Sequence, residues 1–132
     1  MSDDMRCPCG SGDPLADCCA PILDRRRQAG TAQQLMRSRY TAFALRDLAH
    51  LLVSWHPSTR PVADELARSL EDGTRWLHLA ILRIEAGGPF DDQGTVEFRA
   101  LAKGPGGRVE LHETSRFVRE DGHWLYVDGD VV

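Results

Sequence analysis

Apolar residues recur at helical spacing through the first half of the chain. The longest such run follows Thr31, which together with Gln34 forms the signature of a capping box at a helix N-terminus. Its apolar positions are Leu35, Met36, Tyr40, Phe43 and Ala44. Asp47 is suited to cap a second short helix, which must end before His56-Pro57. A third helix is expected from about Pro61 to Leu70, with the proline tolerated in its first turn.

After Gly73 the pattern changes from helical to strand-like. Four runs follow, at Trp76–Glu85, Thr95–Ala102, Arg108–Arg119 and His123–Asp128. The segments between them are rich in glycine, proline and aspartate, which are turn-forming residues. In the second run Val96 and Phe98 face one side of a strand, and the charged residues between and after them face the other. Helices followed by an antiparallel meander predict an α+β fold in which the sheet curls around the long first helix.

Length and charge fit one compact domain. The chain has 132 residues, enough to bury a core, and a formal net charge of −4. Residues 61–132 carry 14 acidic and 8 basic side chains, a balance that argues against broad nucleic-acid binding. No stretch reaches membrane-spanning length, and no apolar leader follows the first methionine. We therefore expect a cytoplasmic protein with no membrane span and no nucleic-acid partner.

The cysteines of the chain, Cys7, Cys9, Cys18 and Cys19, all lie within its first nineteen residues. Their spacing around a Gly-rich turn is typical of a small four-thiolate metal site, and zinc accepts four such ligands tetrahedrally. A site filled by four protein ligands is structural rather than catalytic. Arg6 and the run at residues 25–27 are placed to offset its negative charge. Disulfide pairing and redox-active or free thiols are the alternatives, but a reducing cytosol favours metal ligation.

The cysteine segment resembles a known motif. Cys7-Pro8-Cys9-Gly10-Ser11-Gly12, followed five residues later by Cys18-Cys19, is similar to the SEC-C motif, first recognised at the C-terminus of the SecA translocase. In that motif two cysteines, a Ser-Gly turn and a terminal pair surround zinc. The interval from Asp13 to Asp17 is acidic here, whereas SEC-C segments usually carry basic residues there. This departure weakens any transfer of SecA-type partner binding, but not the zinc assignment.

The whole chain resembles the uncharacterised YchJ family of bacterial proteins. The residues that carry this resemblance are Leu35 through Phe43, Trp55-His56-Pro57, Trp76-Leu77, Val96-Glu97-Phe98, His112-Glu113, Ser115-Arg116-Phe117 and Trp124 through Gly129. The resemblance implies a zinc knuckle at residues 1–24 and a nuclear-transport-factor-two-like, or cystatin-like, α+β domain at residues 25–132. Such a domain is a cone of curved antiparallel sheet around helices. Dimerisation through the exposed sheet face is common among proteins of this resemblance, so a homodimer is one expectation.

The open end of such a cone often forms a pocket, and eight residues are candidates to line it. They are Arg37, Arg39, Tyr40, Trp55, His56, Glu113, Ser115 and Tyr126. Arg37 and Arg39 are two apart on the first helix and must face different sides. For either arginine the alternatives are an ion pair with Glu97 or Glu113, which we favour, and a clamp on an anionic ligand.

Glu113 stands out among these candidates. It lies on a strand face shared with Val109, Leu111, Ser115 and Phe117, so a carboxylate falls in the middle of a largely apolar row. It is either paired inside the cone with Arg37, Arg39 or Tyr40, exposed in a pocket, or turned outward by a bulge. If His56 converges with Glu113, the two could form a base and its orienting group. His112 must face the opposite side of the strand.

Two functions from different classes remain. The first is a zinc-stabilised adaptor, in which the knuckle presents a surface to a protein partner. The second is a small-molecule enzyme or carrier that uses the cone interior, with Glu113 or His56 as base. We favour the first, because the cysteine signal is strong and none of the familiar hydrolase, phosphate-binding or dinucleotide motifs occurs in the sequence.

Overall fold

A computed structural model describes residues 5–132, so the start of the predicted 1–24 knuckle lies outside the described residues. The helical elements are η1 (Leu15–Asp17), α1 (Ala20–Leu23), α2 (Ala32–Leu45), α3 (Leu48–Val53) and α4 (Ala63–Ser69). The strands are β1 (Arg75–Ala86), β2 (Gln93–Gly104), β3 (Gly107–Glu120) and β4 (His123–Val131). Three helices and four strands of the sequence analysis are confirmed, whereas η1 and α1 are too short to show a periodic pattern.

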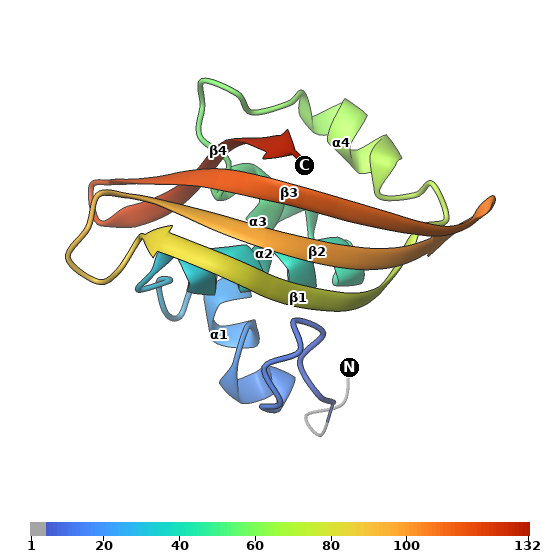
Figure 1. The fold of residues 1–132 in the computed structure, drawn as a ribbon, viewed down its shortest axis with the longest axis horizontal. Helices are drawn as coiled ribbons and strands as arrows, with labels where there is room; N and C mark the ends of the chain where they lie inside the picture. The colour runs from blue at the N-terminus through green and yellow to red at the C-terminus, as the bar shows by residue number, and fades with distance from the viewer. Residues whose placement is uncertain (1–4) are drawn as a thin grey trace.

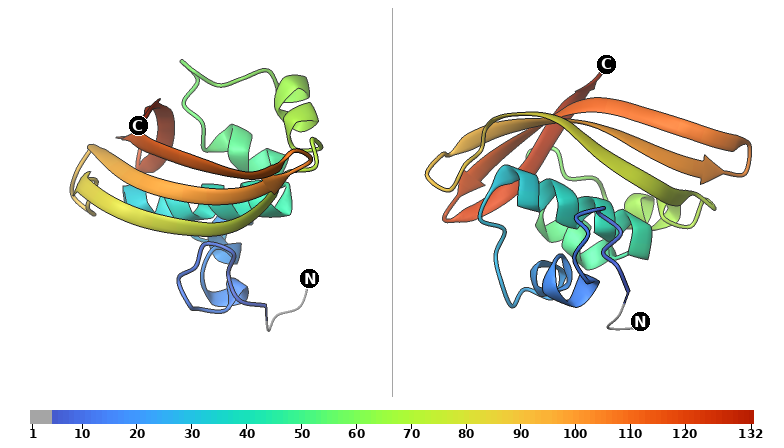
Figure 2. Two further views of the ribbon diagram at one scale, coloured as in Figure 1. Left: turned by 45° about the vertical axis from the view of Figure 1, so that its right-hand side comes forward. Right: turned by 60° about the horizontal axis from the view of Figure 1, so that its bottom comes forward.

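The strands form one antiparallel sheet in the order β1-β2-β3-β4. The curved sheet wraps over α2 and α3, and the N-terminal segment lies against the helices beside the edge strand β1 (Figures 1 and 2). This is the predicted α+β cone. No helix among residues 5–132 is long and apolar enough to cross a membrane.

The helices α2 and α3 begin where their predicted capping residues place them. The Thr31 side chain accepts a hydrogen bond from the Gln34 backbone N–H at 3.1 Å. The Gln34 side chain reaches one residue further back than in a standard capping box and accepts from the Gly30 N–H at 2.8 Å. Asp47 caps α3 in the same way. Arg46 adopts φ 61° between the two helices, and this left-handed residue turns the chain sharply from α2 into α3.

The register of the sheet decides which side chains face the helices. β2 and β3 pair without interruption, and Glu113 lies opposite Phe98. Glu113 therefore faces inward by regular alternation, and the bulge considered for it does not occur. β1 is irregular at two places, between Trp76 and His78 and between Ile81 and Arg83, and such irregularities bend a strand.

One hydrophobic core joins the cysteine knuckle to the cone. Its buried members from the N-terminal segment are Cys7, Cys9, Leu15, Cys19 and Ile22. Its buried members from α2 and the sheet include Leu35, Met36, Tyr40, Leu79, Val96, Phe98, Phe117 and Trp124. A second cluster of Ala42, Leu51 and Leu66 joins α2, α3 and α4. The α2 helix therefore packs against the knuckle, the sheet and the other helices at once. The boundary at residue 24 remains a prediction.

A buried histidine links α2 to α3. The Ser38 hydroxyl donates to the Leu35 carbonyl oxygen (2.8 Å) and lies 2.9 Å from Nε2 of His50. Because the single hydroxyl hydrogen is used there, Nε2 must donate to Ser38, which leaves Nδ1 as an acceptor. Nδ1 is buried without a hydrogen-bond partner. Burial, reinforced by the nearby Arg39 charge, lowers the pKa of His50 to about 4 from its ordinary 6.5.

We predict that His50 makes the protein acid-labile. Between pH 6.5 and pH 4 the unfolded chain binds a proton at His50 and the folded chain does not, so the free energy of unfolding falls as the pH is lowered. The loss is on the order of 3 kcal/mol by pH 4 and is absent above pH 7. Urea unfolding of wild type and His50→Gln at several pH values measures it. The difference between the two curves should change with pH, and a constant difference would contradict the prediction.

Candidate metal centre and cone cavity

The four cysteine sulfurs converge on one point. Their Sγ atoms all lie within 4.8 Å of one another. Cys18 Sγ is 3.7 Å from that of Cys9 and 3.9 Å from that of Cys19. A zinc ion with Zn–S bonds of about 2.3 Å sets tetrahedral S–S edges of about 3.8 Å, which matches these separations. All four cysteines are free, and the separations are far longer than the roughly 2.0 Å of a disulfide. The residues present therefore fit a tetrahedral metal ion.

Backbone turns bring the two cysteine pairs together. The first pair lies in a loop closed by a hydrogen bond from the Cys7 N–H to the Asp13 carbonyl oxygen (3.0 Å). Gly10 and Gly12 have φ of 81° and 92°, which residues with a Cβ rarely adopt. Cys19 is the N-cap residue of α1. The adjacent Cys18 and Cys19 thus reach one point where a first helical turn begins.

Without a metal, protons are distributed unevenly over the four sulfurs. Hydrogen bonds from the Cys19 and Cys7 thiols hold the pKa of Cys9 far below the ordinary thiol value. Hydrogen bonding to Cys7 and Cys9 correspondingly raises the pKa of Cys19. Burial raises the pKa of Cys18 to about 11, although the Ser11 hydroxyl lies 3.1 Å from its sulfur. A metal ion that takes four thiolates must therefore displace protons, so its binding weakens as the pH falls.

Arginines from three parts of the chain hold the backbone of the knuckle. Arg6 donates to the Gly12 carbonyl oxygen at 2.7 Å, and Arg27 donates to that of Cys18 at 3.3 Å. Both belong to the arginines predicted to offset the negative charge of the cysteines, and both bond to the knuckle backbone. Arg26, expected to join them, instead pairs with a neighbouring carboxylate at 2.8 Å.

Arg37 of α2 is the third arginine that contacts the knuckle backbone. It was predicted to line the cone pocket, and this prediction is wrong. Its Nη1 donates to the Cys9 carbonyl oxygen at 2.8 Å, so α2 is tied directly to one of the four clustered cysteines. Thr41, one turn further along α2, places its hydroxyl 3.6 Å from Cys7 Sγ. The spacing of Arg37 and Arg39 indicated that they face different sides, but not that the knuckle covers one of them.

A cavity of about 170 Å³ lies inside the cone. It is lined by six of the eight predicted pocket residues: Arg39, Tyr40, Trp55, Glu113, Ser115 and Tyr126. The other lining residues were not predicted; they are Met36, Phe43, Trp76, Phe98, Ala100 and Leu111. These are ordinary apolar core positions, and nothing in the sequence separates core that borders a cavity from core that does not.

Arg39 is buried, with 4% of its surface exposed, and it bonds to uncharged groups. Its Nη1 donates to the Leu51 carbonyl oxygen (3.1 Å) and to the Ser54 hydroxyl (2.7 Å). The guanidinium lies 4.7 Å and 4.6 Å from the ring centroids of Trp55 and Tyr126, as a cation between aromatic faces. Burial lowers the pKa of Arg39 to about 9, which still leaves it charged at neutral pH.

The ion pair expected between Arg39 and Glu97 or Glu113 does not form among the described residues. Glu97 instead pairs with His112 at 2.6 Å, on the outer face of the sheet. Glu113 accepts a hydrogen bond from the Ser115 hydroxyl at 2.6 Å. As predicted, His112 and Glu113 face opposite sides of β3. Arg39 instead bonds to the Leu51 carbonyl oxygen of α3 and to the hydroxyl of its C-cap residue, Ser54. Matching opposite charges along the sequence does not reveal such uncharged partners.

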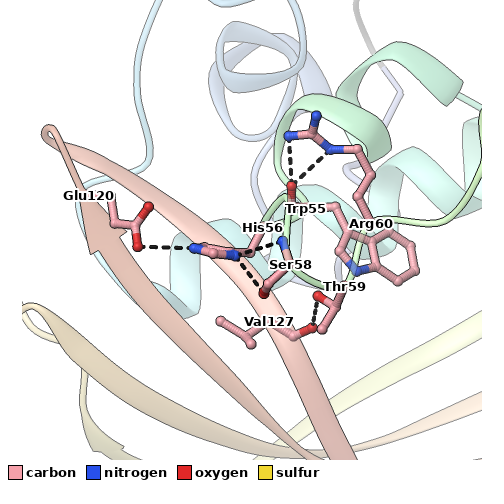
Figure 3. A network of polar contacts seen from close by, with 7 residues as sticks. All are labelled: Trp55, His56, Ser58, Thr59, Arg60, Glu120 and Val127. Atoms are coloured by element: carbon pink, nitrogen blue, oxygen red, sulfur yellow. Dashed lines mark hydrogen bonds and ion pairs between the residues drawn. The ribbon is translucent and has the colours of Figure 1, made fainter.

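His56 lies outside the cavity, which contradicts its predicted place in the pocket. Its Nε2 is 3.0 Å from a Glu120 carboxylate oxygen, and its Nδ1 is 2.7 Å from the Ser58 hydroxyl. Figure 3 shows this network in the loop after α3, where Arg60 also donates twice to the Trp55 carbonyl oxygen. His56 therefore does not meet Glu113, and the suggested base-and-orienter pair is not formed.

A four-cysteine knuckle packed on the helices of a curved sheet defines a protein that joins a metal-binding motif to a nuclear-transport-factor-two-like domain. Residues 6–21 match the SEC-C motif, and residues 31–129 match the family described as YchJ, middle NTF2-like domain. The chain therefore belongs to the YchJ-like family, as its sequence motifs indicated.

Similar proteins agree with this assignment. A UPF0225 protein of Chromobacterium violaceum is 51% identical over 126 residues, covering 93% of this chain and 90% of its own length. The solution structure of a SEC-C motif containing protein from Rhodopseudomonas palustris superimposes with a TM-score of 0.86 at 36% identity, covering 97% of this chain and 99% of that one. A protein of unknown function with a cystatin-like fold from Nostoc punctiforme has a TM-score of 0.53 at 12% identity, covering 75% of this chain and 85% of that one, which shows the fold alone.

We predict that Arg37 supports metal binding although it is not a ligand. Loss of its hydrogen bond to the Cys9 carbonyl oxygen frees the first cysteine pair, so Arg37→Ala should weaken Zn²⁺ affinity about tenfold or more, as expected for a group that orients a metal ligand. Competition with a chromophoric chelator measures the affinity. Arg26→Ala removes an equally charged side chain, which pairs with Asp24 and has no hydrogen bond to the cysteine loop among residues 5–132, and is the matched control. Equal affinities in the two variants would contradict the prediction.

Proposed function

We propose that the metal bound by Cys7, Cys9, Cys18 and Cys19 is a single structural zinc ion. Four thiolate ligands with tetrahedral spacing favour zinc, and sulfurs that all lie within 4.8 Å suit one ion rather than a larger cluster. Four protein ligands leave no open position for a substrate or an activated water. Four free thiols also suit a reducing compartment, which supports a cytoplasmic location.

We propose further that the protein works through its surface, as an adaptor for a protein partner. A closed metal site performs no chemistry of its own, so its role is to hold the N-terminal segment in place against α2. The observation that carries the interaction role is Phe90, in the loop between β1 and β2, which is 95% exposed. An exposed phenylalanine offers a large apolar side chain for burial against a partner, and aromatic residues are enriched in the buried centres of protein interfaces.

The loop that carries Phe90 is held in a defined conformation. Arg119 of β3 donates from its side chain to the Pro89 carbonyl oxygen at 2.6 Å and from its backbone to the Asp92 carbonyl oxygen at 2.8 Å. The Gly88 N–H is bonded to a carboxylate within the same loop. An anchor that is already ordered loses little conformational entropy on binding. Acidic residues follow Phe90 at positions 91 and 92, so a complementary partner offers an apolar pocket flanked by positive charge.

The zinc assignment predicts one Zn²⁺ per chain in native mass spectrometry of protein purified without chelator. Because the metal orders a segment with little core of its own, EDTA should raise amide hydrogen exchange in residues 5–24. Amides of β2 and β3 should stay protected, since their ladder does not depend on the metal. Cys18→Ser should reproduce the effect of EDTA. Protein without bound metal would refute the zinc centre, and global unfolding on chelation would show that the knuckle is not a separable segment.

The adaptor role predicts that Phe90→Ala abolishes capture of a partner without changing stability. The measurement is affinity capture from a lysate of a bacterium that carries a relative, such as Chromobacterium violaceum, followed by titration of the purified partner. Loss of one aromatic anchor should weaken binding by at least about 2 kcal/mol. Val62→Ala removes another exposed apolar side chain, 64% exposed and outside the β1–β2 loop, and is the matched control. Equal capture by both variants would contradict the role of Phe90, and sedimentation would show whether the partner is a second copy of the chain.

A further inference from the structure

The cone cavity has the size of a small aromatic molecule. Its volume is about 170 Å³. An engineered apolar cavity of about 150 Å³ in an unrelated protein binds benzene, so there is room here for one ring with a small substituent. Six of the twelve lining side chains are aromatic: Tyr40, Phe43, Trp55, Trp76, Phe98 and Tyr126. Tyr40 and Trp76 already form an edge-to-face pair at 5.9 Å, the arrangement that aromatic rings prefer.

One carboxylate in this aromatic wall has unused hydrogen-bonding capacity. The Ser115 hydroxyl donates to Oε2 of Glu113. The described residues provide the Glu113 carboxylate with no other hydrogen bond or ion pair. An ionised carboxylate can accept about four hydrogen bonds. Glu113 is partly buried in the cavity wall, where acceptors without donors are costly. The cavity therefore favours a molecule that brings an O–H or N–H group to this carboxylate.

The backbone of β4 leaves a specific space for the Glu113 carboxylate. At Gly129, which lies beside it, an added Cβ would come within 2.5 Å of the Glu113 Cδ. Any other residue at position 129 would displace the carboxylate. Glu113 also lies in an uninterrupted stretch of the β2–β3 ladder, so its inward direction is fixed by the register. Its position in the wall is thus determined by two neighbouring strands.

The charges of the cavity favour an uncharged ligand. Arg39 contributes one buried positive charge, and Glu113 contributes one negative charge close enough to raise the pKa of Arg39. Tyr126 stays neutral, because burial and then the Glu113 charge raise its pKa to about 12. The opposite charges balance, and a ligand with a net charge would leave one of them uncompensated in a site of low polarity.

We infer that the cone cavity binds a small neutral aromatic molecule that donates one O–H or N–H hydrogen bond to Glu113, with phenol as its simplest example. The aromatic lining packs against the ring, and the carboxylate selects the donor. This binding activity goes beyond the adaptor role and does not depend on it, because the residues involved lie inside the cone and Phe90 lies outside it.

Titration of the ¹⁵N-labelled, zinc-loaded protein with phenol, followed by NMR, tests this inference. The chemical shifts of the Trp76 indole N–H and of the amides around Glu113 should change with added phenol and reach a plateau. Toluene has the same size without a donor and should bind about tenfold more weakly, which is the difference that one charge-assisted hydrogen bond makes. Benzoate and benzylammonium, which carry charges, should also bind more weakly than phenol.

Substitutions at Glu113 and Gly129 distinguish a specific binding site from adventitious binding. Glu113→Gln keeps the size of the side chain but removes its charge, so it should lose most of the preference for phenol over toluene. Glu97→Gln makes the same change on the outer face of the sheet and should keep that preference. Gly129→Ala displaces the carboxylate and should act like Glu113→Gln, which provides a second test if Glu113→Gln does not fold. Equal affinities for phenol and toluene in the wild type, or tighter binding of benzoate, would overturn the inference.

Discussion

The arrangement of this protein depends on one helix that is buried on several sides at once. Five consecutive residues of α2 point into different surroundings. Arg37 and Thr41 contact the cysteine knuckle, Ser38 contacts the histidine of α3, and Arg39 and Tyr40 line the cone cavity. Polar side chains on such a helix cannot turn to water, so each needs a partner from a neighbouring element. The knuckle, α3 and the sheet supply these partners, and this requirement fixes their positions relative to one another.

The cysteine cluster and the cavity share a wall because of this burial. Tyr40 belongs to the same buried cluster as Cys7, Cys9 and Cys19, and its other side borders the cavity. Burial, followed by the charge of Cys9, raises the pKa of Tyr40 to about 12. The cysteine cluster and the cavity are therefore separated by one side chain rather than by a long chain of contacts. In this chain the SEC-C segment shares a buried core with the domain, although it matches a separate motif.

Local signals in the sequence predict most of the fold and the clustering of the four cysteines. Thr31 and Asp47 mark helix starts, turns separate the strands, and the spacing of the cysteines alone predicts that they converge. The predictions that failed concern Arg37, Arg39 and His56, whose partners come from elements distant in the chain. The carbonyl oxygens that Arg37 and Arg39 contact carry no signature in the sequence, and His56 meets a carboxylate 64 positions away. Pairing rules for charged side chains favour ion pairs, so they miss a guanidinium held by carbonyl groups and aromatic rings.

The order in which the core is assembled has a consequence for biosynthesis. A ribosome produces this chain from its N-terminus, so the thiols of residues 7–19 emerge well before Leu79 of β1, which packs against them in the finished core. During that interval the sulfurs are open to oxidants and to metal ions alike. An early metal ion would protect the thiols and give α2 a finished surface on which to fold. If a metal ion binds in that interval, its supply in the cell affects the yield of folded protein without changing the final structure.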